Sequence, residues 1–231
     1  IEVKDEDTIG ILVDQLNATT QMRWDYAFGM RTKRIKGTYY EAFAVVWRTD
    51  RASLGRGIVS NISDPNGVYR NDPYLVSFYR GNFDFTLLLV HTRWDSDEEG
   101  TREGEVAELA NQLSFLRGFL KEKDIIVAGD FNYSGTAGPV TRFAQNAACT
   151  QIDPNVPTTF KGDYGAYNES YDHIFISSAD TKEFANESGV LDSTALVFGD
   201  TGRQSMKSSK EQLSDHLPVW AAFATSLPDD D

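Results

Sequence analysis

The sequence predicts an α/β fold in which mixed β-sheets are flanked by helices. Short apolar runs with the composition of strands alternate with segments whose apolar residues recur every three or four positions, the spacing of a helix face. Some runs follow one another directly, whereas others are separated by a helical segment. Both antiparallel and parallel strand neighbours are therefore expected.

The first half of the chain is expected to hold one helix and three strands. Residues 6–17 place Ile9 and Leu12 near helical spacing. Runs rich in aromatic and β-branched residues predict strands at 41–47, 74–79 and 83–90. The third of these strands is followed directly by His91.

The second half opens with a clear amphipathic segment. Residues 102–120 carry valine, leucine and alanine at three- and four-residue steps, which predicts a helix with one apolar face. The apolar run 124–128 predicts the next strand, and a short helix is expected at 141–148. Further strands are expected at 175–176 and 219–223.

The composition suits one sizeable domain over residues 1–231, since 40% of the residues are hydrophobic and no linker interrupts the chain. The net charge of -13 argues against non-specific coating of nucleic acids, which relies on Lys and Arg. Carboxylates that hold a divalent cation can still receive a phosphate, so phosphodiester chemistry stays open. The single cysteine, Cys149, is expected to be a small buried side chain. No apolar run reaches the ~18 residues that span a bilayer, so stable membrane insertion is not expected.

Polar motifs lie where several of the apolar runs end or begin. They are His91, Gly129-Asp130-Phe131-Asn132, Tyr171-Asp172-His173 and Ser214-Asp215-His216. In this order the motifs resemble the endonuclease/exonuclease/phosphatase superfamily, the fold of pancreatic-type DNases and of the exonuclease III type of abasic-site endonucleases. The resemblance covers essentially the whole chain. It implies a four-layer sandwich, with two packed mixed β-sheets flanked by helices.

The resemblance also implies a divalent cation held by carboxylates. Glu2, in Ile1-Glu2-Val3, matches the family's metal-binding Glu on an early strand, and Asp215 is the second candidate ligand. Oxygen ligands suit Mg²⁺ or Mn²⁺, and Ca²⁺ as a structural ion stays open. In the family a first strand with a metal-proximal Asn, and then a helix, precede the Glu strand. Residues 1–231 are expected to lack that strand and helix.

The chain has three histidines, and the resemblance assigns roles to two of them. His216 resembles the family's general base, and Asp172 resembles the carboxylate that orients it. His91 resembles the second His of the DNase-like branch, with Glu41 in the place of its orienting Glu. His173 alternates with Asp172 along one strand, so we expect it on the opposite face, in a structural role.

Four more residues match contacts to water or substrate. Asp130 and Asn132 are two positions apart, so in an extended chain both project to one side; the family uses them to position the attacking water and to bind a phosphate oxygen. Arg70, one residue farther from Pro73 than the family spacing, is a candidate phosphate contact or else a solvated loop residue. Tyr39 is a candidate for stacking on a sugar or base, or else a strand-edge aromatic.

These features predict a divalent-metal-dependent phosphodiesterase, and the resemblance of Glu41 and His91 to the DNase-like branch favours a DNA endonuclease. A phospholipid phosphodiesterase of the sphingomyelinase type, or an inositol-phosphate phosphatase, shares the same core and stays open. A catalytically inactive binding module is disfavoured because His216 and Asp130 are both present. No obligate protein partner is evident, and the compartment stays open among secreted, periplasmic and cytoplasmic.

Overall fold

The centre of the fold is a six-stranded sheet with the strand order β5-β6-β7-β8-β10-β9. The computed structural model describes residues 1–30, 32–33, 40–64, 66–94, 99–120, 122–153 and 155–228. The strands of the large sheet are β5 (Ser53–Asn61), β6 (Tyr74–Arg80), β7 (Phe83–His91), β8 (Ile125–Asp130), β9 (Cys149–Ile152) and β10 (Asp172–Ser177). β7 and β8 run parallel and the other neighbours run antiparallel, so the sheet is mixed.

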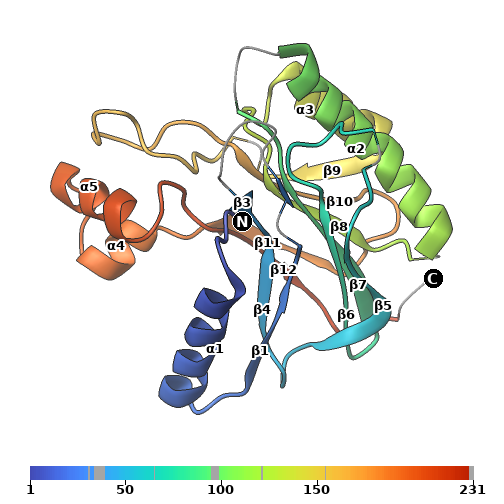
Figure 1. Cartoon of the computed structure of the whole chain (residues 1–231), viewed down its shortest axis with the longest axis horizontal. Coiled ribbons are helices and arrows are strands. Elements are labelled where there is room, and N and C mark those ends of the chain that lie inside the picture. The colour runs from blue at the N-terminus through green and yellow to red at the C-terminus, as the bar shows by residue number, and fades with distance from the viewer. Residues whose placement is uncertain are drawn as a thin grey trace.

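Two helices, α2 (Glu99–Leu120) and α3 (Gly138–Asn146), cover one face of this sheet (Figure 1). α2 connects β7 to β8, because two parallel neighbours need a crossover between them. Its apolar face, including Leu109 and Leu113, is buried against Leu88 and Val127 of the strands. The largest hydrophobic core therefore lies between these helices and the sheet.

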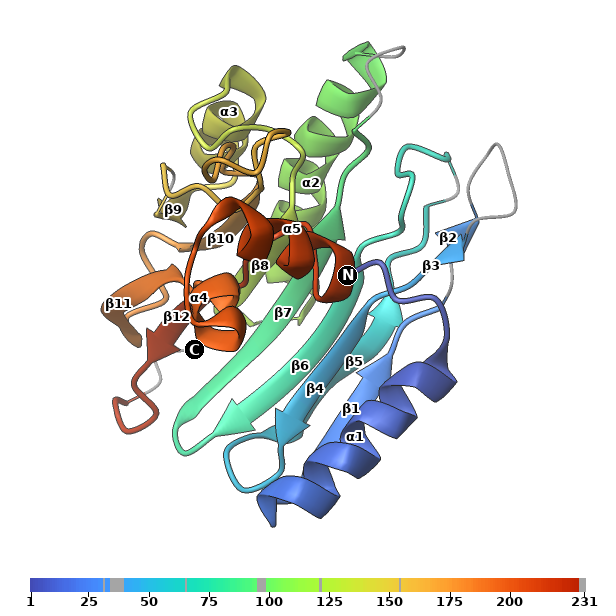
Figure 2. The same ribbon diagram turned by 90° about the vertical axis from the view of Figure 1, so that its left-hand side faces the viewer.

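Two small sheets cover parts of the opposite face. β1 (Trp24–Phe28) pairs with β4 (Ala44–Arg48), and β11 (Phe184–Val190) pairs with β12 (Val219–Phe223). In Figure 2 they lie to either side of β6 and β7. Helix α1 (Glu6–Thr20) packs outside β1. The structure thus has the predicted four layers: helices α2 and α3, the large sheet, the two small sheets, and α1. The second sheet layer is divided in two.

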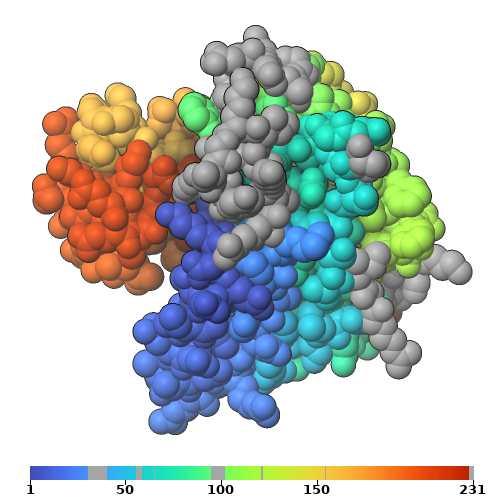
Figure 3. Space-filling view, viewed as in Figure 1, coloured from blue at the N-terminus to red at the C-terminus, as the bar shows by residue number. Residues whose placement is uncertain are grey.

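The remaining elements lie at the margins of these layers. β2 (Thr32–Lys33) and β3 (Tyr40–Glu41) form a short pair near the N-terminus. α4 (Ser193–Phe198) and α5 (Arg203–Gln212) form a lobe at the side, seen in orange and red in Figure 3. Met206 anchors α5 by packing with Phe160 and Leu217. Within the described ranges, no helix combines the length and apolar composition needed to cross a bilayer.

The main differences from the predicted elements are at their bounds. The predicted strand 41–47 is divided between β3 and β4, and the helix predicted at 141–148 begins earlier, at Gly138, with Pro139 in its first turn, where proline is favoured. β1, β2, β5, β9, β11, α4 and α5 were not predicted. β11 illustrates why, since most of its residues are exposed or half-buried and show no alternating apolar pattern.

Candidate active site

Three neighbouring strands bring polar residues to one edge of the large sheet. β7 ends at His91, β8 ends at Asp130, and β10 begins at Asp172. His91 is the register partner of Asp130 across the parallel pair, and Asp172 is its partner across the antiparallel pair. The three side chains therefore form one row, with Asp130 in the middle.

The turn after β8 depends on Gly129. Its φ of +144° is a backbone conformation that other residues rarely adopt, and a Cβ there would lie 1.9 Å from the carbonyl oxygen of Val90. The chain then turns at once, because Asn132 has a φ of 51° and its backbone N–H donates to Asp130 Oδ1 at 2.6 Å. The chain is therefore not extended from Asp130 to Asn132. Both side chains still reach the same cavity, and Asn132 Nδ2 donates to the carbonyl oxygen of Thr92 at 2.8 Å.

His216 and Asp172 form a close pair. His216 Nδ1 donates to Asp172 Oδ2 at 2.6 Å, and the other ring nitrogen, Nε2, lies 4.0 Å from Asp130 Oδ2. Thr158 holds the pair together, since its hydroxyl accepts from the backbone N–H of Asp172 and its carbonyl accepts from the N–H of Leu217. The predicted pairing of His216 with an orienting carboxylate is thus present in the geometry.

The charges of this row shift two pKa values. Burial alone would lower the pKa of His216, but the hydrogen bond and charge of Asp172, with Asp130 and Asp215 nearby, raise it to about 9. Burial, together with the charge of Asp172, raises the pKa of Asp130 to about 6. In the metal-free protein His216 is therefore protonated at neutral pH.

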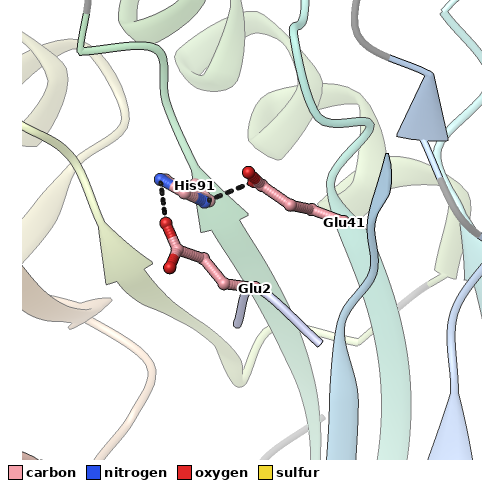
Figure 4. A group of neighbouring side chains, drawn as sticks. All are labelled: Glu2, Glu41 and His91. Carbon is pink, nitrogen blue, oxygen red and sulfur yellow. Dashed lines mark ion pairs between the residues drawn. The ribbon is translucent and has the colours of Figure 1, made fainter. Parts of the chain in front are cut away.

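His91 lies between two glutamates (Figure 4). Its Nδ1 is 3.3 Å from Glu41 Oε2, and its Nε2 is 3.7 Å from Glu2 Oε1 and 3.8 Å from Asp130 Oδ2. A β-bridge between Val3 and Ala42 brings the two glutamates into this position. Glu41 is buried, whereas the side chain of Glu2 is 55% exposed.

These groups surround a cavity of about 320 Å³. It is lined by Ile1, Glu2, His91, Trp94, Asp130, Asn132, Asp172, Ser214, Asp215 and His216. The structure thus brings most of the predicted site residues together. Thr158 and Trp94 were not predicted, because a threonine in a loop and a single aromatic after a strand carry no distinctive sequence signal.

The donor set fits a divalent cation. Glu2 and Asp215 offer carboxylate oxygens, which Mg²⁺ and Mn²⁺ prefer, into the open cavity. A second group of potential ligand atoms, from Glu2, Glu41 and His91, lies within 4.8 Å of one another. The space beside Glu41, however, has no room for a water molecule, which favours a direct pairing of Glu41 with His91 over a hydrated ion there.

Two predicted or discussed residues, Arg70 and His173, are not among the described residues that line the cavity. Arg70 donates its backbone N–H to Glu105 Oε1 at 2.6 Å. Tyr39 lies outside the described residues. His173 is buried on the α2–α3 face, where Nε2 donates to the carbonyl oxygen of Tyr133 at 2.9 Å, as expected for a residue that alternates with Asp172.

The comparisons with known proteins agree with this architecture. The model of the endonuclease/exonuclease/phosphatase family matches residues 2–216. No curated protein shows significant sequence similarity to the chain. Among solved structures, the catalytic domain of human Nocturnin, with bound sulfate, has a TM-score of 0.61 at 16% identity, over 96% of this chain and 78% of that chain.

Two bacterial structures are similar to a comparable degree. A protein of the endonuclease/exonuclease/phosphatase family from Leptotrichia buccalis has a TM-score of 0.60 at 15% identity, over 96% of this chain and 80% of that chain. The 3′ phosphatase NExo from Neisseria, bound to a product DNA hairpin, has a TM-score of 0.57 at 17% identity, over 96% of each chain. At such identities these likenesses show the fold alone. Because the family model spans most of its length, this chain belongs to the endonuclease/exonuclease/phosphatase family.

Proposed function

We propose that the protein is a divalent-metal-dependent phosphodiesterase that cleaves DNA as an endonuclease. Members of its family are hydrolases that act on phosphoester bonds. The observation that carries the proposal is the row of His91, Asp130 and Asp172 at one edge of the sheet, joined by His216 in the same cavity. This set combines a group for proton transfer with groups that stabilise charge on a phosphate.

His216 is the proposed proton acceptor for the attacking water. Because Nδ1 is bonded to Asp172, Nε2 is the nitrogen that remains for the water. Asp130 Oδ2 is 4.0 Å from Nε2, a separation that one water molecule can bridge with a hydrogen bond to each. Asp130 would therefore position the water, and His216 would take its proton.

His91 and Asn132 are proposed to stabilise the negative charge that develops on the phosphate. Glu41 holds Nδ1 of His91 and leaves Nε2 on the cavity side. One amide N–H of Asn132 is bonded to Thr92, so the second is available to a phosphate oxygen. Donors held in this way need little reorganisation during the reaction.

The charge of the cavity calls for a cation. The described lining residues include four carboxylates, from Glu2, Asp130, Asp172 and Asp215, and neither Lys nor Arg. Such a wall repels a phosphodiester unless positive charge is added. A divalent cation held by Glu2 and Asp215 would supply charge that attracts the phosphate, lowers the pKa of the His216 ring and stabilises the leaving oxygen.

DNA is the proposed substrate because Glu41 and His91 resemble the orienting pair of the DNase-like branch, and they lie 3.3 Å apart. The similar structure of NExo holds a DNA hairpin, which shows that this fold accommodates DNA in that protein. The contacts predicted for Arg70 and Tyr39 stay predictions.

Nicking of supercoiled plasmid tests the proposal. We expect cleavage with Mg²⁺ or Mn²⁺ and none in EDTA, and Glu2→Gln and Asp215→Asn should each need more metal for half-maximal rate. Asp14→Asn, an exposed carboxylate on α1, is the matched control and should titrate like the wild type. Equal cleavage in EDTA would contradict the mechanism.

Parallel reactions with RNA, sphingomyelin, an inositol phosphate and a DNA 3′-phosphate separate the substrate classes. Cleavage of sphingomyelin or of the inositol phosphate without plasmid nicking would show that the substrate is a phospholipid or an inositol phosphate and not DNA. Removal of the terminal phosphate alone would identify a phosphomonoesterase.

A further inference from the structure

Trp94 is an exposed aromatic side chain at the wall of the cavity. It is 61% exposed and lines the cavity with His91 and Asn132. An indole presents a large apolar face, tryptophan is enriched at interfaces, and ligand pockets are commonly lined by aromatic side chains. What distinguishes Trp94 from other exposed aromatics is its position beside the proposed reacting groups, where the ring is accessible to a ligand in the cavity.

The backbone that carries Trp94 is firmly held. The backbone N–H of Thr92 donates to the carbonyl oxygen of Asp130 at 3.0 Å, and the Thr92 hydroxyl donates to the carbonyl oxygen of Phe131 at 2.5 Å. Arg93 donates to Glu105 through its backbone N–H at 2.8 Å and through Nε at 3.0 Å. Glu105 is 1% exposed, so this ion pair is buried and its geometry is restricted. The exposed ring thus starts from a segment that is locked to the turn after β8.

The negative charge of the protein favours an aromatic contact over a basic one for binding substrate in this cavity. The net charge is -13, and the described residues that line the cavity include no Lys or Arg, so contacts from basic side chains contribute little binding there. Stacking of a base on an aromatic ring needs no positive charge and tolerates any base. An anionic lipid surface would be repelled, and Trp94 and Ile1 are the only apolar side chains among the described lining residues.

We propose that Trp94 stacks on the nucleobase next to the scissile phosphate. The proposal rests on the proposed function and extends it, because it assigns a nucleotide, and not only a phosphodiester, to this cavity. Trp94 is then a substrate-binding residue that contributes to specificity, and it does not take part in proton transfer.

Two substrates with the same leaving group test the proposal. Thymidine 5′-(4-nitrophenyl phosphate) carries a base, and methyl 4-nitrophenyl phosphate does not. Trp94→Ala should lower kcat/KM for the thymidine ester by roughly 5- to 150-fold, mainly through KM, the range expected for loss of one base stack. The methyl ester should be hydrolysed at the wild-type rate, and Trp94→Phe should restore most of the loss. Phe115→Ala is the matched control, since Phe115 is an aromatic side chain on α2 with a similar exposure of 62%.

Equal losses on both esters, or no loss on either, would overturn the proposal. If the wild type hydrolyses neither ester, nucleotide binding is read from tryptophan fluorescence in the presence of Mg²⁺, and the proposed function fails only if plasmid nicking is also absent. Quenching by thymidine monophosphate in the wild type but not in Trp94→Phe would support the stack, and the absence of quenching would overturn it. Loss of binding to sphingomyelin vesicles in Trp94→Ala, with unchanged kinetics on the thymidine ester, would instead assign Trp94 to a lipid contact.

Discussion

Replacing Asp172 by Asn in the metal-free protein should change how stability depends on pH. The short hydrogen bond from His216 to Asp172 raises the pKa of the ring to about 9, against an ordinary value of 6.5. Between these two pH values the folded state keeps a proton that the unfolded state has released. The free energy of unfolding therefore falls as the pH rises through this range, and the contribution is fully present only below about 6.5.

The size of the effect follows from the same two pKa values. Since each pKa unit corresponds to ~1.4 kcal/mol, the proton contributes on the order of 3 kcal/mol to stability at the acid end of the range. Asp172 supplies most of the stabilisation, because it alone bonds directly to the ring. The Asp172→Asn variant should therefore be less stable than the wild type near pH 6, and the two should converge toward pH 9.5.

Urea denaturation in EDTA at several pH values from 6 to 9.5 measures this difference. Asp130, with a pKa of about 6, is already ionised over most of the range, and the titration of Cys149 is common to all the proteins compared. Asp14→Asn is again the control and should follow the wild type. If the free energy of unfolding depends on pH in the same way in the wild type and in Asp172→Asn, the raised pKa of His216 does not come from its pairing with Asp172.

Three other perturbations test separate parts of the structure. Glu41→Gln and His91→Ala should each slow DNA cleavage. Because Glu41 acts through the His91 ring, the double variant should be little slower than His91→Ala alone. Additive losses in single-turnover rates would argue against the pair. Burial lowers the pKa of His173, so the unfolded state takes up a proton before the folded state does as the pH falls below about 6.5. The free energy of unfolding therefore falls in acid, and in urea titrations the His173→Gln variant should lose less of it between pH 7 and 5 than the wild type does. Gly129→Ala, whose Cβ would meet the carbonyl of Val90, should lower the free energy of unfolding by ~3 kcal/mol or more, and a variant of wild-type stability would disprove the strain argument.

The elements that could be predicted are those with a strong local pattern. Residues 102–120 lie within α2 because Leu109 and Leu113 repeat at helical spacing and are fully buried. The order of the strands and the division of the second sheet layer could not be predicted, since pairing depends on residues far apart in the sequence. β11 was missed for a related reason, because its exposed middle residues resemble a loop.

The same distinction applies to the candidate site. His91, Asp130 and Asp172 could be proposed because each adjoins an apolar run, so the end of the strand is visible in the sequence. The conformation at Asn132 could not, since a φ of 51° depends on the hydrogen bond to Asp130. Trp94 resembles any other aromatic residue until its exposure is known.

The topology of the large sheet explains why the proposed reacting groups and the proposed substrate contact of Trp94 occupy separate segments. In the parallel pair β7–β8 both strands end at the same edge, and antiparallel β10 begins there, so His91, Asp130 and Asp172 meet on rigid strand ends. An exposed side chain on the loops that continue from these ends, such as Trp94, can be changed without moving that row. Within this family the row should therefore determine the reaction and the loops the substrate. For this chain, that makes Trp94 the residue at which a change of substrate should be sought first.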